Sequence, residues 1–207
     1  MSQRHSATIL AGDIGGTKTV LALYRYQEGR LNPLTKKQFV SKDYADFSDI
    51  VNAFLKEAES SEADAACFGI AGPVIGGRCK TTNLPWEIEA SRLKQQLSTE
   101  NLRLLNDLEA TAYGMLYLSP SEFVDLNPQA NAQEGNRAII AAGTGLGEAM
   151  LFFDGTQYHP VGSEGGHCDF APADDQQSAL LAWLRRRYPD HVSYERVLSG
   201  PGLYTLY

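Results

Sequence analysis

The sequence of 207 residues predicts an α/β fold in which helices flank a sheet, built as two units. Apolar runs of strand length alternate with segments whose apolar residues recur at helical spacing. A pattern of strand, glycine turn and strand occurs near the start of the chain and again from residue 138. A stretch rich in proline, asparagine and glycine lies at residues 119–136. We therefore expect domains at residues 1–118 and 119–207.

Composition excludes several classes of protein. Hydrophobic residues make up 43% of the chain and charged residues 21%, as in ordinary globular proteins. A net charge of -7 argues against a non-specific nucleic-acid binder or a binder of anionic membranes, since both need a basic face. Three cysteines without a CxxC pair indicate neither a disulfide framework nor a cysteine zinc site. We find no signal peptide and no membrane span, and expect a cytoplasmic protein.

The first hairpin is expected to bind phosphate. Residues 7–10 and 20–24 have strand composition, and the sequence GDIGGT lies between them. Gly15 and Gly16 are predicted to take backbone angles closed to other residues, so that their amides can approach an anion.

Two polar residues belong to the same turn. The hydroxyl of Thr17 can add a further donor, and the carboxylate of Asp13 is placed where it could hold a hydrated magnesium ion against the phosphates. The alternative is a plain hairpin turn in which Asp13 accepts hydrogen bonds from nearby backbone.

The remainder of the first unit alternates strands and helices. We expect, in order, an edge strand, a helix, a buried strand, a hairpin through Gly76 and Gly77, a helix, a strand and a helix, at residues 36–44, 46–60, 65–72, 72–86, 90–98, 102–107 and 108–118. Either Asp46 or Ser48 can cap the first of these helices.

The second glycine hairpin occupies residues 138–153. Gly143 and Gly145 free the backbone amides of its turn, and Thr144 supplies a hydroxyl. The spacing is GxGxG, without the third glycine of a dinucleotide fingerprint and without a following helix, which argues against nicotinamide binding. A later helix, at residues 174–187, has an acidic start and a basic end that suit the helix dipole.

Five ordered motifs, DIGGT, LLNDLEATAYG, AGTGLG, EGGHCDF and YERVLSGPG, resemble those of the bacterial glucokinase family, part of the hexokinase and actin-like ATPase superfamily. The resemblance implies an actin-like ATPase (ribonuclease H-like) fold with two domains and a central mixed sheet in each. It implies phosphorylation of glucose to glucose 6-phosphate, with ATP and Mg²⁺, by a protein that forms a homodimer at full length. The implied nucleotide-binding residues are Gly12, Asp13, Ile14, Gly15, Gly16, Thr17, Gly143, Thr144 and Gly145.

Chains of the family continue beyond the SGPGLYTLY at which this sequence stops. The resemblance therefore leads us to expect an N-terminal portion of a glucokinase with an incomplete second domain and no adenine pocket. Residues 203–207 are expected to form the first turn of a further helix.

Asp107 is the candidate general base. It follows an apolar strand and opens a helix, where α/β folds gather functional groups. A sugar kinase needs a carboxylate that orients the hydroxyl and accepts its proton. The alternative is that Asp107 caps the helix. Asn106, beside it, is expected to contact the sugar.

The remaining sugar-binding residues come from the resemblance. It assigns Glu164 and His167, which flank a Gly-Gly turn, and Glu195 to the sugar. It also places Asn83 in a sugar-contacting loop, with Trp86 as an apolar wall. The alternatives are a structural histidine, a glutamate on a solvated helix face and an asparagine in a turn before proline.

Two neighbours of the Gly-Gly turn are expected to have supporting roles. We interpret Cys168 as a packing thiol and Asp169 as a turn former or a support for the sugar ligands.

Other functions stay open at this stage. One is a kinase for another hexose or amino sugar, and another is a sugar-binding protein without turnover. A sugar-binding transcription regulator is a third alternative, but only about ten residues precede the first strand, too few for a DNA-binding module.

Overall fold

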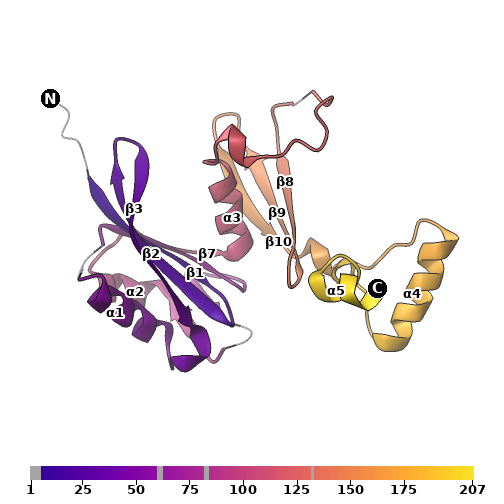
Figure 1. The fold of residues 1–207 in the computed structure, drawn as a ribbon, viewed down its shortest axis with the longest axis horizontal. Helices are drawn as coiled ribbons and strands as arrows, with labels where there is room; N and C mark the ends of the chain where they lie inside the picture. Colours follow the sequence, from indigo (N-terminus) through magenta and orange to yellow (C-terminus); the bar gives the residue numbers. More distant parts are fainter. Residues whose placement is uncertain (1–5, 60–62, 82–83, 132) are drawn as a thin grey trace. The chain divides into compact units, whose positions relative to one another are not determined.

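The computed structural model describes residues 6–59, 63–81, 84–131 and 133–207 (Figure 1). Contacts divide the chain into two compact units, with the boundary between Thr111 and Ala112. The domain limits expected from the sequence stay a prediction. Among the helices described, none has the length and apolar character needed to cross a bilayer.

The first unit is built on a five-stranded mixed sheet, in the order β3-β2-β1-β4-β7. Its strands are β1 (Ala7–Ile14), β2 (Lys18–Gln27), β3 (Arg30–Val40), β4 (Ala65–Ile70) and β7 (Leu102–Asn106). The first three strands are antiparallel neighbours, whereas β4 runs parallel to both β1 and β7. The carboxyl ends of β1, β4 and β7 therefore meet at one edge of the sheet. The expected hairpin, edge strand and buried strand are present, but the edge strand occupies Arg30–Val40 and not residues 36–44, since Ser41–Asp43 form a 3-10 helix.

Two helices, α1 (Phe47–Glu57) and α2 (Ala90–Leu97), cover the same face of this sheet (Figure 1). Asp46 caps α1 by accepting a hydrogen bond from the amide of Ser48 at 2.7 Å, so the cap is Asp46. The apolar stripe of α1 packs on the inward residues of the strands in one core. Its fully buried members include Leu10, Leu21, Ile50, Val51, Phe54, Phe68, Ile70, Leu93 and Leu97.

A short hairpin pairs β5 (Arg78–Lys80) with β6 (Glu87–Glu89). Gly76 and Gly77 have φ values of 59° and 74°, and Ile75 and Arg78 on either side exchange backbone hydrogen bonds. These left-handed angles are those of a tight hairpin turn, as the Gly-Gly pair predicts.

Trp86 does not form an apolar wall beside a sugar loop, so that expectation is wrong. Its side chain is 2% exposed, packs against Phe47 with 6.3 Å between ring centroids, and donates its indole N–H to the carbonyl of Tyr44. A large ring with a satisfied donor is more stable inside the core than on its surface.

The second unit contains an antiparallel sheet in the order β10-β9-β8. The strands β8 (Arg137–Ala142) and β9 (Leu146–Phe153) form the second glycine hairpin expected from the sequence. The third, β10 (Tyr158–Ser163), was not predicted.

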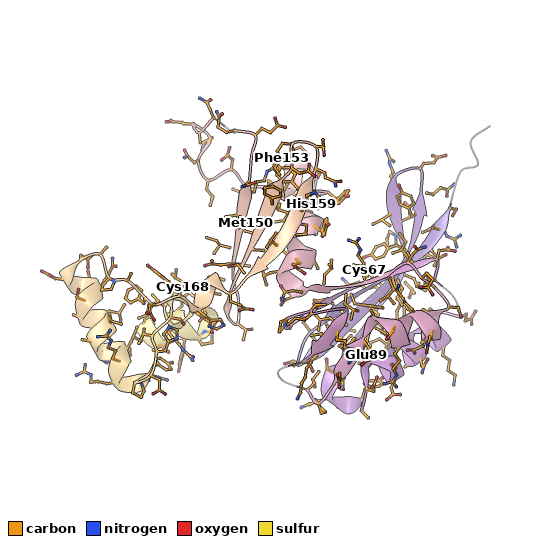
Figure 2. The ribbon with its side chains drawn as sticks, turned by 180° about the vertical axis from the view of Figure 1, so that it is seen from behind. Cys67, Glu89, Met150, Phe153, His159 and Cys168 are labelled. Carbon is orange, nitrogen blue, oxygen red and sulfur yellow. The ribbon has the colours of Figure 1, made fainter. Side chains whose placement is uncertain are left out.

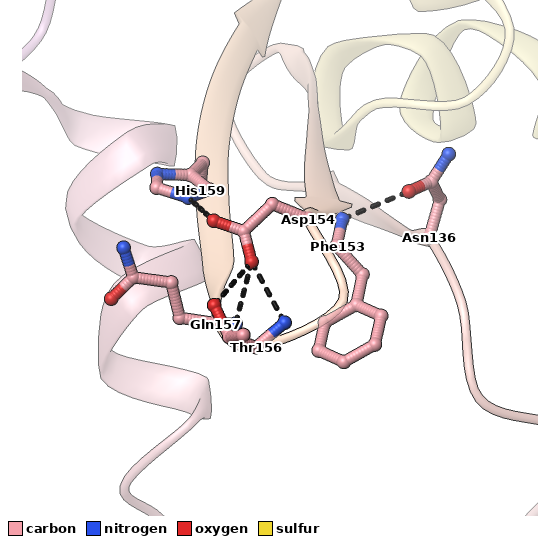
Figure 3. A network of polar contacts seen from close by, with 6 residues as sticks. All are labelled: Asn136, Phe153, Asp154, Thr156, Gln157 and His159. Atoms are coloured by element: carbon pink, nitrogen blue, oxygen red, sulfur yellow. Dashed lines mark hydrogen bonds and ion pairs between the residues drawn. The ribbon is translucent and has the colours of Figure 1, made fainter.

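The turn between β9 and β10 is organised by Asp154 (Figure 3). Its carboxylate accepts hydrogen bonds from Thr156 and from the amide of Gln157, and contacts the ring of His159 at 2.6 Å. These contacts hold the pKa of Asp154 below its usual range, with the His159 contact as the largest cause. Gly155, with φ of 95°, completes the turn. The Asp-Gly pair is thus the sequence signal for the unpredicted strand.

The end of the chain forms α4 (Asp175–Arg187) and α5 (Gly200–Leu206), with the short 3-10 helices η3 (Gly165–His167) and η4 (Tyr194–Arg196). Asp174 caps α4 by accepting from the amide of Gln177, and Arg185, Arg186 and Arg187 lie in its last turn, as expected. A small core of Phe170, Leu184, Val192 and Val197 joins these segments.

Candidate active site

Asp107 is the first residue of α3 (Asp107–Met115), which follows β7 without an intervening residue. Its carboxylate accepts a hydrogen bond from the amide of Leu108 at 2.9 Å. Burial, the largest cause, and the charge of Asp13 together raise the pKa of Asp107. The hydrogen bond from Leu108 opposes them without cancelling them. A carboxyl in this environment gains affinity for a proton, as a general base requires.

The helix cap is Asn106 and not Asp107. The side-chain oxygen of Asn106 accepts from the amide of Leu108 at 2.9 Å, and its amide group donates to the carbonyl of Gly72 at 3.1 Å. The capping function that could have explained Asp107 therefore belongs to its neighbour.

Asp13 lies at the carboxyl end of β1 with an exposed side chain. It pairs in register with Gly69 of β4, and β4 separates it from β7, which leads to Asp107. No group of three or more His, Cys, Asp or Glu side chains among the described residues forms a cage for a metal ion. The expected magnesium contact through Asp13 and water does not need such a cage and stays a prediction.

The turn between β1 and β2 has the expected position but a different backbone. Neither Gly15 nor Gly16 has a positive φ, so the prediction of unusual backbone angles is wrong. The amide of Gly15 donates to the carbonyl of Lys18 at 3.0 Å, and a Cβ on Gly15 would lie 3.1 Å from that oxygen. Lack of space, and not backbone conformation, accounts for Gly15.

A distant serine supports this turn. The fully buried hydroxyl of Ser41 donates to the carbonyl of Gly15 at 2.8 Å and lies 3.0 Å from the hydroxyl of Thr19, which is also fully buried. The amide of Ser41 donates to the carbonyl of Thr17. Sequence analysis missed Ser41 because it is separated from Gly15 by 26 residues and no local pattern marks it.

Gly12 has a packing role. A Cβ at this position would lie 2.7 Å from both Leu21 Cδ2 and Phe68 Cδ1, inside the core. Gly12 and Asp13 also line an open groove of about 740 Å³ on the sheet, together with Lys18.

The second glycine turn, at residues 143–145, is tied to the end of the chain. The carbonyl of Gly143 accepts from the amide of Gly200 at 2.8 Å, and the carboxylate of Glu195 accepts from the amide of Leu146 at 3.0 Å. A Cβ on Gly145 would lie 2.5 Å from the same carboxylate. Glu195 is therefore a partly buried residue of η4. The alternative that it lies on a solvated helix face is wrong.

The Gly-Gly turn between Glu164 and His167 packs directly on β9. A Cβ on Gly166 would overlap the carbonyl oxygen of Leu146, and one on Gly165 would overlap the carboxylate of Glu148. The side chains of Glu164 and His167 are 78% and 57% exposed and lie 3.8 Å apart. The second unit thus brings Glu164 and His167 together on an exposed turn, with the His167 ring not buried as a structural histidine.

One expectation near this turn needs correction. Cys168 is exposed, so it is not a packing thiol (Figure 2). Asp169 pairs with His191 at 2.7 Å and forms an isolated β-bridge with Ser193, so it joins two distant segments of the chain. Its expected role as a turn former or a support for the sugar ligands stays a prediction. Asn83 lies outside the described residues.

Sequence analysis also missed Glu109, whose carboxylate accepts from the backbone amide of Asn106 at 3.1 Å. The spacing Asn-x-x-Glu at the start of a helix is the signal that could have found it.

Comparisons with known proteins agree with this architecture. The sequence model of the family described as "Glucokinase" matches residues 10–207. The chain is 41% identical over 202 residues to a glucokinase of Nostoc sp., covering 96% of this chain and 59% of that protein. It is 39% identical over 210 residues to a glucokinase of Synechocystis sp., with the same coverage.

Solved structures show the same fold. The crystal structure of a glucokinase from an Antarctic psychrotroph is similar with a TM-score of 0.82 and 32% identity, covering 95% of this chain and 62% of that one. A glucokinase from Balamuthia mandrillaris in complex with glucose has a TM-score of 0.72 and 25% identity, covering 96% and 61%. The chain thus spans about six tenths of the length of the relatives that it matches. It has the actin-like ATPase fold of these proteins and belongs to the glucokinase family.

Proposed function

We propose that the protein carrying this chain is a glucokinase that transfers the γ-phosphoryl group of ATP to the 6-hydroxyl of glucose, with Asp107 as the general base. The observation that carries the proposal is the partly buried carboxylate of Asp107 at the carboxyl end of β7, with its pKa raised by burial and by Asp13. Family membership supplies the reaction class, and this carboxylate supplies the group that the reaction needs.

The proposed reaction transfers one phosphoryl group and releases one proton from the sugar hydroxyl. The 6-hydroxyl oxygen forms a bond to the γ-phosphorus, the bond from that phosphorus to the β–γ bridging oxygen breaks, and ADP leaves. The hydroxyl proton passes to Asp107. Phosphoryl transfer depends mainly on positioning and charge stabilisation, so the orientation of the hydroxyl by the carboxylate matters as much as the proton transfer.

The nucleotide is proposed to bind at the two glycine turns. In the first turn, Ser41 holds the carbonyl of Gly15 and so fixes the backbone of the turn. The amide of Gly15 already donates to the carbonyl of Lys18, so Gly16 and Thr17 would supply the donors for the phosphates. Asp13 fits a magnesium ion because it is exposed and its charge already raises the pKa of Asp107, and a divalent cation would relieve that repulsion. Magnesium, when bound, would neutralise charge on the phosphates.

The sugar is proposed to contact Asn83, Asn106, Asp107, Glu164, His167 and Glu195. The support is chemical, since each can form hydrogen bonds with hydroxyl groups, which donate and accept. Glu195 uses one oxygen for the amide of Leu146, which leaves its other oxygen for a ligand. These roles, the homodimer and the cytoplasmic location stay predictions.

A coupled assay of glucose-dependent ADP formation tests the function, with glucose, mannose and glucosamine as competing substrates. Asp107→Ala is compared with Asp49→Ala, which removes an exposed aspartate from the first turn of α1. We expect glucose turnover in the unsubstituted protein and in Asp49→Ala, and its loss in Asp107→Ala. A preference for another sugar would replace glucose as the substrate. A glucose-dependent change in tryptophan fluorescence without ADP formation would indicate a sugar-binding protein.

A further inference from the structure

The start of α3 is closed by a reciprocal pair of hydrogen bonds. Asn106 accepts from the amide of Leu108 through its side-chain oxygen, and its own backbone amide donates to the carboxylate of Glu109 at 3.1 Å. This arrangement resembles a capping box, except that the side chain of the cap accepts from the amide of the second helical residue, Leu108, and not from that of the third. We call it the Asn106–Glu109 box.

Asp107 lies inside this box. It is the first helical residue, between the cap Asn106 and the amide of Leu108, which also donates to the Asp107 carboxylate. The turn has little room to move toward the sheet, because a Cβ on Gly69 of β4 would lie 3.0 Å from the Cβ of Ala110. The direction of the Asp107 side chain therefore depends on the closure of the box.

The cap itself is held from the far side. The Asn106 side chain donates to the carbonyl of Gly72, and a Cβ on Gly72 would lie 3.3 Å from the sulfur of the buried Cys79. Asn106 thus has fixed partners on three of its groups. Two of them, the amide of Leu108 and the carboxylate of Glu109, come from the same helix as Asp107, and Glu109 is the one that binds through its side chain.

We propose that Glu109 is a positioning residue for the general base, holding Asp107 in place through the backbone amide of Asn106. The proposal rests on the proposed function, in which Asp107 is the base. In this role the carboxylate of Glu109 acts only as a hydrogen-bond acceptor. A residue of the same side-chain length with an acceptor oxygen, such as glutamine, should therefore replace Glu109.

The chain offers a matched control. Glu122 also closes the start of a helix, the 3-10 helix η2 (Pro120–Glu122), where its carboxylate accepts from the amide and hydroxyl of Ser119 at 2.8 Å. None of the candidate site residues belongs to that helix. Glu122→Ala removes a capping carboxylate and leaves the surroundings of Asp107 unchanged.

Steady-state kinetics of the full protein test the proposal in Glu109→Ala, Glu109→Gln and Glu122→Ala. We expect kcat to fall about 10- to 100-fold in Glu109→Ala with a glucose KM within about threefold, because a displacement of about 1 Å costs rate by such factors. Glu109→Gln and Glu122→Ala should keep kcat within about threefold. Glu109→Asp keeps the charge but has a side chain that is one methylene shorter, so its kcat should fall as in Glu109→Ala. This variant replaces Glu109→Ala in the test if the latter fails to fold.

A pH profile separates positioning from loss of fold. The groups that act on the Asp107 carboxylate include Asp13 from β1, Cys79 from β5, the amide of Leu108 and the side chain of Asn106. The hydrogen bond from Leu108 lowers the pKa of Asp107, and a looser turn weakens that bond. The pKa of Asp107 should therefore rise in Glu109→Ala, and the acid limb of the kcat/KM profile should move to higher pH. It should stay in place in Glu109→Gln.

The outcomes distinguish the two proposals. Equal kcat in Glu109→Ala and the unsubstituted protein would overturn the positioning role alone. Loss of kcat in Glu109→Gln equal to that in Glu109→Ala would also overturn it, since the acceptor would then not be what matters. Turnover that survives Asp107→Asn, or no turnover in the unsubstituted protein, would overturn the proposed function and this inference with it.

Discussion

The charge of Asp13 raises the pKa of Asp107, although β4 lies between the strands that carry the two residues. The relationship arises because β1, β4 and β7 run parallel and end at the same edge. The Asp107 carboxylate is partly buried, and this burial raises its pKa further than the charge of Asp13 does.

Removing the charge of Asp13 should make Asp107 a weaker base. In Asp13→Asn the pKa of Asp107 is expected to fall, because a like charge that favours its protonated form is gone. A carboxyl NMR titration of Asp107 without magnesium, from about pH 3 to 8, would measure the fall in both forms of the protein. A pKa of Asp107 that rises, or that is unchanged, in Asp13→Asn would refute the coupling.

Neutralising Asp107 should stabilise the protein while removing its activity. The pKa of Asp107 is raised in the folded state, so its contribution to stability is present below the unfolded-state pKa of about 3.9 and is lost as pH rises through the folded-state value. At pH 7 the ionised Asp107 carboxylate lowers the free energy of unfolding, and Asp107→Asn removes this destabilising charge. Thermal unfolding at pH 7 should show a midpoint roughly 1–3 °C higher for the variant, a gain that shrinks near pH 4. A lower midpoint at pH 7 would show that burial of this charge costs nothing.

The hydroxyl pair of Ser41 and Thr19 should be energetically coupled. Ser41→Ala leaves the buried Thr19 hydroxyl and the Gly15 carbonyl without their partner, at a cost of about 1–3 kcal/mol. Once Ser41 is gone, Thr19→Val should add little, because the hydroxyl that it removes has already lost its partner. A double-mutant cycle by denaturant unfolding measures the coupling, expected at about 0.5 kcal/mol or more. Additive effects would mean that the two hydroxyls act separately.

Gly166 should be intolerant of any side chain. In Gly166→Ala the new methyl group would overlap the carbonyl of Leu146, so the turn must move away from β9, at a cost of at least about 1–3 kcal/mol. Gly143→Ala is the control in the same unit, since a Cβ there meets nothing within 4 Å. Chemical unfolding of both variants makes the comparison. Equal stability of the two would mean that the turn at Gly166 is free to relax.

The sequence predicts those parts of the fold that depend on residues close together in the chain. The helical spacing of Ile50, Val51 and Phe54 predicted α1, and the Gly76-Gly77 pair predicted a tight turn, because each depends on neighbouring residues alone. The strand β10 was missed although Asp154 and Gly155 carry a turn signal.

Contacts between distant residues were beyond such patterns. Trp86 was assigned to a binding surface because a sequence motif does not reveal that Tyr44 and Phe47 enclose it. Ser41 was missed for the same reason. The candidate residues Asp107 and Asn106 followed from their place at a strand end and from the family resemblance, whereas the assignment of the helix cap to Asn106 required the three-dimensional structure.

The most direct test of the account is the turnover of Asp107→Asn against its binding of glucose. The variant keeps the side-chain shape and an oxygen that can accept from Leu108, but it cannot take up the proton of the sugar hydroxyl. We expect glucose binding, followed by tryptophan fluorescence or calorimetry, to stay within about tenfold of the unsubstituted protein, while ADP formation falls by at least about 100-fold. Turnover within a few-fold of the unsubstituted protein would contradict the assignment of Asp107 as the base.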